Sequence, residues 1–292
     1  MSIILIVLLI LIFLHIKYNK QTNDSYHILQ IDSPSKTVFE ETLNKKQPTV
    51  ILNVGSQWKE LMALTPEYIK RNCADYSIYL QTSIKEQQHT KIIKTTLREY
   101  IEWIANNNNN TNHENRYISH NKSFLQDYGL VDKLDNYINP PLLVLKEHSF
   151  SMGPTGTKVG LHYDRTYRNI LYQIYGRTKI ILFSPANTKY LYTSGRYDGS
   201  SVLSKIDFWN QDLNTYPLFN KAQFIEITLY PGQMLYIPAY WWYATENIDT
   251  CITISIKTEN IFSSIEKVPE VIKSLYHLNG LYKKNNCTCH SF

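Results

Sequence analysis

The chain has 292 residues, 43% of them hydrophobic and 13% aromatic, so it can bury one substantial core. Its formal net charge is only +5 and its basic residues form no Lys/Arg run, so the charge gives no indication of nucleic-acid binding. Four cysteines are too few for a disulfide framework, which is typical of a protein in a reducing compartment.

An apolar run opens the chain. Residues 1–16 are apolar almost without interruption, and Lys17 and Lys20 follow them. A spanning helix needs roughly 17–25 residues, and the flanking Tyr18 and Lys17 extend the run toward that length. A signal peptide is the alternative, but the run lacks a basic segment before it and a small-x-small cleavage site after it. We therefore expect residues 1–20 to be a single-pass membrane anchor, with the folded domain on the cytosolic side.

The remaining chain divides into three parts by composition. Residues 21–34 are polar and are expected to be a linker, residues 35–262 form the main domain, and residues 263–292 hold a C-terminal helix and a tail. Pro269 is expected to mark the first turn of that helix, where proline is favoured. The tail carries a C-x-C-H motif, which we expect to be part of a disordered end rather than a metal site. Its residues are Cys287, Cys289 and His290.

The first half of the main domain is predicted to mix helices and strands. Apolar periodicity indicates helices over residues 36–46 and 97–105, and residues 48–54 are typical of a buried strand. Another helix is expected to begin at Pro66, with Thr65 as its N-cap.

Two polar stretches interrupt the domain. Residues 106–115 are rich in asparagine and predict a solvated loop. Residues 187–224 form a long insertion rich in Tyr, Asp and Ser, and such insertions often carry substrate contacts.

A Gly-rich turn leads into His162 and Asp164, which lie two apart on a predicted strand and therefore share a face. Imidazole and carboxylate on one face supply two of the three ligands of a 2-His-1-carboxylate Fe(II) site. An H-x-D pair alone is a weak signal, but its surroundings add to it. Residues 169–185 alternate and then turn apolar like a buried strand pair, and residues 229–245 hold a Pro-Gly turn, an apolar strand and an aromatic cluster.

These motifs resemble, in their order, the JmjC/cupin-8 family of Fe(II)- and 2-oxoglutarate-dependent hydroxylases, including the asparaginyl hydroxylase that acts on hypoxia-inducible factor. The order is H-Y-D, N, Q-x-x-G-R, L-F-x-P and P-G-x-x-L-Y-I-P-x-Y-W-W, and the resemblance covers roughly residues 30–262. It implies a mainly β fold with flanking helices around a double-stranded β-helix (jelly-roll, cupin) core at about residues 140–260. It also implies Fe(II) and 2-oxoglutarate if the protein is active, and a homodimer through the C-terminal helix.

Three positions depart from the family's pattern. Tyr243 stands where the family has its second metal-binding histidine, and Val159 stands where it has Thr or Ser. The lysine that grips the distal carboxylate of 2-oxoglutarate is replaced by Thr178. A lysine follows one step later, but Lys179 should face away unless a bulge re-aims it.

The resemblance assigns the metal to His162, Asp164 and the degenerate position Tyr243. A phenol is a poor ligand for Fe(II), because it must lose a proton whose pKa is about 10. Alternatively, Tyr243 fills the old site and hydrogen-bonds Asp164. The residues assigned to the co-substrate region are Asn169, Thr178, Lys179 and Lys257.

Lys257 comes from the strand expected over residues 251–259, where it shares a face with Thr253 and Ser255. It would place an ammonium inside the barrel, either paired with Asp164 or as an anchor for an acid ligand. In the alternative, Lys257 lies at the end of the strand and extends to water.

Two functions are consistent with this pattern. The first is a membrane-anchored binding module for a protein partner, with a degenerate site, impaired catalysis and no required cofactor. The alternative is an active 2-oxoglutarate-dependent protein hydroxylase with an unusual His/Asp/Tyr metal site. The altered Val159, Thr178 and Tyr243 favour the first function, while the retained His162 and Asp164 keep the second open.

Overall fold

The computed structural model describes the main domain and parts of both ends. The described residues are 6–8, 10–11, 13–14, 26–54, 58–83, 91–107, 115–132, 138–139, 142–165, 168–194 and 201–281. Among them, no helix is both long and apolar enough to cross a membrane. Most of the expected anchor over residues 1–20, and all of the C-x-C-H motif, lie outside the described residues.

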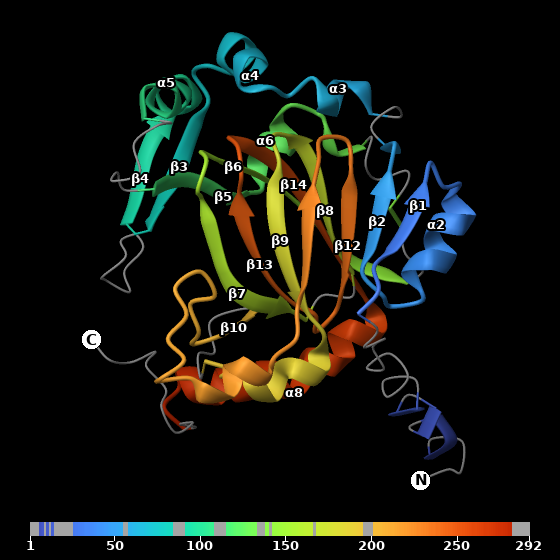
Figure 1. Cartoon of the computed structure of the whole chain (residues 1–292). Coiled ribbons are helices and arrows are strands. Elements are labelled where there is room, and N and C mark those ends of the chain that lie inside the picture. Colours follow the sequence, from blue (N-terminus) through green and yellow to red (C-terminus); the bar gives the residue numbers. More distant parts are fainter. Residues whose placement is uncertain are drawn as a thin grey trace.

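Two β-sheets form the centre of the molecule (Figure 1). In spatial order, the larger sheet consists of β1 (Leu29–Asp32), β2 (Thr49–Leu52), β12 (Met234–Pro238), β8 (Arg168–Tyr175), β14 (Cys251–Asn260), β6 (Leu143–Gly153), β5 (Asn115–Asn121), β3 (Ser77–Ser83) and β4 (Lys91–Thr96). The smaller sheet consists of β10 (Ser201–Leu203), β7 (Lys158–Asp164), β13 (Trp242–Asn247), β9 (Thr178–Phe183) and β11 (Ile225–Leu229). The fold is thus cupin-like and mostly β, consistent with the expected jelly-roll core.

Helices cover the sheets at both ends. In chain order they are α2 (Lys36–Leu43), α3 (Lys59–Met62), α4 (Pro66–Asn72), α5 (Leu97–Asn107), α6 (Ser123–Asp127) and α8 (Ile261–Leu278), with 3₁₀ turns η2 (Pro185–Tyr190) and η3 (Pro217–Lys221). α3, α4 and α5 lie at one end, and α8 crosses the other (Figure 1). The predicted N-cap is confirmed, because the Tyr68 amide donates to Thr65 Oγ1 at 3.1 Å.

Alternation along β14 separates the core from the barrel interior. Ile252, Ile254 and Ile256 are fully buried in the cluster that also contains residues of α2, α4 and α5. Thr253 and Ser255, on the opposite face, line a cavity between the two sheets. Because side chains alternate along a strand, packing the isoleucines against the helices turns the polar residues inward.

Two expectations about element boundaries were wrong. Part of the expected linker is a strand, since Leu29–Asp32 forms β1 and pairs in parallel with β2. Four residues are too short for a recognisable period, so backbone pairing rather than pattern defines this strand. Pro269 lies inside α8 and not in its first turn. The helix begins earlier because Asn260 and Ser263 form a reciprocal capping box there.

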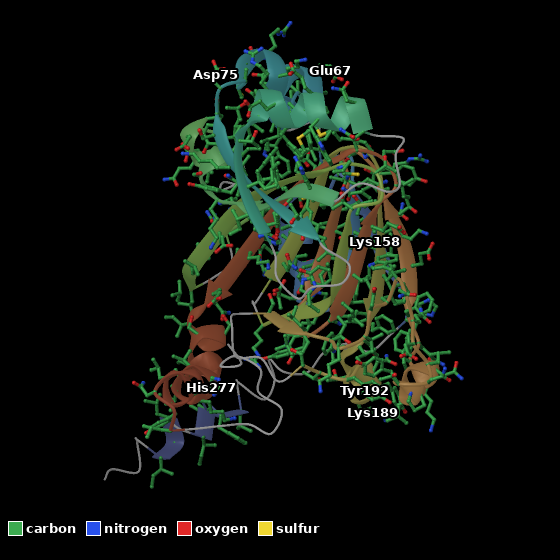
Figure 2. All side chains as sticks on the ribbon, turned by 90° about the vertical axis from the view of Figure 1, so that its left-hand side faces the viewer. Glu67, Asp75, Lys158, Lys189, Tyr192 and His277 are labelled. Carbon is green, nitrogen blue, oxygen red and sulfur yellow. The ribbon has the colours of Figure 1, made fainter. Side chains whose placement is uncertain are left out.

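The described residues of the insertion over 187–224 pack on the smaller sheet. Its aromatic residues Phe208 and Phe219 are buried in one cluster with Phe183 and Trp242. Lys189 and Tyr192 of this region lie at the opposite end of the molecule from Glu67 and Asp75 (Figure 2). Its expected role in substrate contacts stays a prediction.

Candidate functional site

Strand register brings the predicted site residues together. On β7, His162 lies opposite Tyr243 of β13, and Asp164 lies opposite Ser201 of β10. In the other sheet, Lys257 of β14 lies opposite Asn169 of β8. The two sheets face each other here, so side chains from both meet around Asp164.

Asp164 is the centre of this group and is only 3% exposed. Its Oδ2 accepts hydrogen bonds from the Tyr243 hydroxyl at 2.7 Å and from Asn169 Nδ2 at 3.1 Å. Lys257 Nζ lies 2.9 Å from the same oxygen, and the Ser201 hydroxyl donates to Oδ1. Protein groups therefore saturate Oδ2 with three donors, while Oδ1 accepts from Ser201.

These contacts set the protonation of Asp164. Burial on its own would raise the pKa of the carboxyl, but the charge of Lys257, the neighbouring His162 and the hydrogen bond from Ser201 lower it to about 2. Asp164 is therefore an anion at neutral pH and has its counter-charge beside it.

Tyr243 fills the position expected for the second metal-binding histidine. Its ring is buried against His162, with 4.1 Å between the ring centroids. Burial, and then the charge of Asp164, raise the pKa of Tyr243 well above its ordinary range. The phenol therefore keeps its proton and donates a hydrogen bond to Asp164 Oδ2, which is one of the two alternatives that the sequence left open.

His162 is buried and neutral. Its Nδ1 lies 2.8 Å from the Gly160 carbonyl oxygen, which can only accept, so Nδ1 carries the proton and Nε2 does not. Burial lowers the pKa of His162, and Asp164 opposes the shift. Nε2 of His162 is thus the one nitrogen ligand that the described residues offer at the predicted site.

The lysines of the predicted co-substrate set have different positions. Lys257 is only 13% exposed on its side chain and faces Asp164, so it does not extend to water. Lys179 is outside the site, and its prediction as a co-substrate residue was wrong: its ammonium lies 4.0 Å from Glu226 and its side chain is 33% exposed. The pairing of β9 with β13 has no bulge, so Thr178 faces the cavity and Lys179 faces away.

Ser201 is a site residue that the sequence did not indicate. It comes from β10, a three-residue strand within the polar insertion, and it reaches Asp164 because β10 pairs with β7. The only available signal was its place in an insertion expected near the barrel mouth.

The donor set does not match an Fe(II) site. Three ligands with open positions are expected of such a site, whereas this one offers a single imidazole nitrogen, a protonated phenol and a carboxylate already bonded to an ammonium. Nowhere in the described ranges do three or more His, Cys, Asp or Glu side chains gather as a metal site.

Comparison with known proteins gives the family. HSPB1-associated protein 1 of Homo sapiens is 40% identical over 114 residues, which are 39% of this chain and 23% of that protein. Lysine-specific demethylase 8 of Xenopus tropicalis is 28% identical over 241 residues, 78% of this chain and 52% of that protein. Jumonji C domain-containing protein 5 of Drosophila melanogaster is 28% identical over 234 residues, 74% of this chain and 56% of that protein.

The chain thus spans between about a quarter and just over half the length of these relatives. Members of the JmjC family usually use Fe(II) and 2-oxoglutarate. Residues 35–257 match the cupin-like domain family, so the chain belongs to the cupin-like, JmjC-related proteins.

Proposed function

We propose that this protein is a cupin-like binding module in which an internal ion pair takes the place of the catalytic metal. The observation that carries the proposal is the contact of 2.9 Å between Lys257 Nζ and Asp164 Oδ2. The ammonium supplies the positive charge that a buried carboxylate requires. Tyr243 donates to the same oxygen from the position where the family resemblance predicts a second histidine.

The energetics support a site closed to metal. A metal ion that binds Asp164 Oδ2 would have to displace Lys257 and leave the ammonium without its partner in a buried position. Breaking a buried ion pair in this way costs about 3–5 kcal/mol. The co-substrate would also lack its ion pair, because Thr178 has no charge and Lys179 is directed to Glu226.

We further propose that the module acts at a membrane through a protein partner. The apolar run over residues 1–16 supports an anchor with the domain in the cytosol. The name of HSPB1-associated protein 1 describes an association with another protein, which supports a role in protein binding here. α8 exposes an apolar face suited to a second copy of the chain, formed by Ile265, Val268, Ile272 and Leu275.

The second candidate is an active 2-oxoglutarate-dependent protein hydroxylase. The specific observation in its favour is His162, whose Nδ1 is held by the Gly160 carbonyl while Nε2 is available. Metal-binding histidines have this arrangement. The similarity to a lysine-specific demethylase points the same way, while the closer likeness to an asparaginyl hydroxylase stays a prediction.

Succinate formation separates the two candidates. The purified full chain is incubated with Fe(II), ascorbate, oxygen and 2-oxoglutarate, and succinate is measured by mass spectrometry against heat-treated protein. We expect no succinate above that background. Succinate that depends on Fe(II) and disappears in Asp164→Ala would establish the hydroxylase and refute the binding-module proposal.

A further inference from the structure

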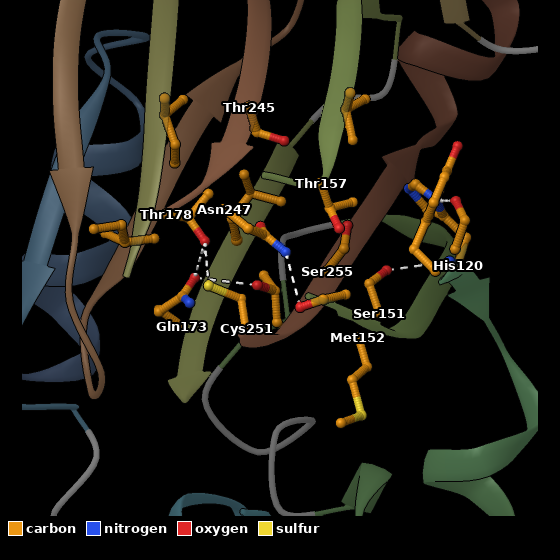
Figure 3. A pocket seen from close by; sticks show the side chains of 18 of the residues that line it. His120, Ser151, Met152, Thr157, Gln173, Thr178, Thr245, Asn247, Cys251 and Ser255 are labelled. Atoms are coloured by element: carbon orange, nitrogen blue, oxygen red, sulfur yellow. Dashed lines mark hydrogen bonds between the residues drawn. The ribbon is translucent and has the colours of Figure 1, made fainter. Parts of the chain in front are cut away.

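A cavity lies beside His162 and Tyr243, between the two sheets. It measures about 100 Å³, which is room for a molecule of several heavy atoms. Gln173, Thr178 and Cys251 gather at one end, and His120 and Ser151 at the other (Figure 3). The apolar part of its wall includes Leu171, Ile180 and Leu229.

The wall of this cavity is uncharged. The described residues that line it include no Asp, Glu, Lys or Arg. Burial raises the pKa of the Tyr117 hydroxyl and of the Cys251 thiol, so both keep their protons. Desolvation of the imidazole, and then the charge of Lys257, lower the pKa of His120 to about 4. All three groups are therefore neutral at pH 7.

Polar groups at the Gln173 end are paired with one another. The hydroxyls of Thr178 and Thr253 both donate to Gln173 Oε1 at 3.1 Å. The Gln173 amide nitrogen donates to the carbonyl oxygens of Tyr175 and Gly176. The donors at this end are already directed at protein acceptors, so a carboxylate placed here would meet neither a cation nor a free donor.

Ser255 is different, since it needs a partner. Its side chain lines the cavity, the residue is 4% exposed, and its Oγ has no hydrogen-bond partner among the described residues. A buried hydroxyl without a partner is unfavourable, and a ligand that bonds to it removes that penalty.

We propose that this cavity binds a small uncharged molecule, with an amide or hydroxyl group at Ser255 and its apolar part against Leu171, Ile180 and Leu229. A dicarboxylate is disfavoured because two anions would lose their hydration, no cation lines the cavity, and the nearby Lys257 is already paired with Asp164. The inference rests on the proposed function in one respect, because it requires that the cavity does not bind 2-oxoglutarate.

A charge series with one carbon skeleton tests this. Glutaramide is neutral, glutaramic acid is a monoanion and glutarate is a dianion at pH 7.5, and 2-oxoglutarate is added for comparison. Binding to the purified full chain is measured by calorimetry and by the shift in Tm. We expect glutaramide to bind at least about tenfold more tightly than glutarate, with the monoanion between them.

Variants locate the binding. Ser255→Ala should weaken glutaramide about three- to tenfold, the loss expected for one hydrogen bond. Thr178→Lys adds a cation to the cavity and should reverse the order, so that glutarate binds more tightly than glutaramide. Lys179→Gln is the matched control on the outer face of the same strand and should change neither affinity. Ser255→Ala keeps the test valid if Thr178→Lys does not fold.

The inference would be overturned if glutarate or 2-oxoglutarate bound as tightly as glutaramide or more tightly. It would also be overturned if glutaramide did not bind at all. Either result without succinate formation refutes the uncharged ligand and leaves the binding-module function standing. Succinate formation refutes the proposed function itself, so the two failures are distinguishable.

Discussion

Replacing Tyr243 with histidine should not restore metal binding on its own, because Lys257 remains paired with Asp164. In Tyr243→His, a metal that binds Asp164 Oδ2 must still displace Lys257 Nζ, which lies 2.9 Å from that oxygen. The pair is buried, since Asp164 is only 3% exposed. Separating the pair leaves a buried ammonium without a partner, which costs about 3–5 kcal/mol of free energy. At 1.4 kcal/mol per tenfold, that is a penalty of roughly 10²- to 4 × 10³-fold in metal affinity. The double variant Tyr243→His with Lys257→Met avoids the penalty.

Anaerobic calorimetry with Mn(II) measures both variants. We expect the double variant to bind roughly 10²- to 4 × 10³-fold more tightly than Tyr243→His alone. Lys179→Met in place of Lys257→Met is the control, since Lys179 is half-exposed and lies 4.0 Å from its partner Glu226. Equal affinity of Tyr243→His and the double variant would refute the idea that Lys257 blocks the site.

Three further predictions concern stability. The pKa of Asp164 is lowered from 3.8 to about 2, so its contribution to the free energy of unfolding is fully present above pH 4 and is lost as the pH falls through 2. Asp164→Asn should therefore make the free energy of unfolding less dependent on pH in this window. An unchanged pH dependence would contradict the lowered pKa of Asp164. Tyr243→Phe removes a buried hydrogen-bond donor to the Asp164 carboxylate and should lower the free energy of unfolding, measured in urea, by about 1.5–3 kcal/mol. A loss below about 0.5 kcal/mol, which is typical of a surface substitution, would contradict this role of the Tyr243 hydroxyl. Asn260→Ala removes the capping box of α8 and should cost about 1 kcal/mol, while Asn279→Ala at the exposed end of that helix should cost less; equal losses would argue against the cap.

The fold was largely predictable because local signals and motif order agreed. Alternation in residues 251–259 predicted which side chains of β14 face the barrel, and Lys257 does face Asp164. The facing of β14 depends on the period of a strand, which the sequence carries directly. The resemblance to the cupin-8 family, rather than any local pattern, predicted that Tyr243 lies with His162 and Asp164, and the three residues do lie on neighbouring strands.

The remaining features depend on contacts that no local pattern carries. Ser201 reaches Asp164 through a three-residue strand, and β1 is a four-residue strand defined by its pairing with β2. Pro269 suggested a helix start, but the capping box at Asn260 decided where α8 begins. Short strands are defined by tertiary pairing, and Pro269 and the Asn260 capping box are two local signals that compete for the start of one helix, so local patterns did not place these features.

The ion pair at Asp164 is most directly tested by crystallography in the presence of metal. Crystals of the unaltered chain grown anaerobically with Mn(II) and 2-oxoglutarate would be measured for anomalous scattering. We expect no anomalous peak between His162 and Asp164, and Lys257 Nζ within hydrogen-bond distance of Asp164 Oδ2. A Mn(II) peak bound by His162 Nε2 and Asp164, with Lys257 displaced, would contradict the proposal that an ammonium has replaced the metal.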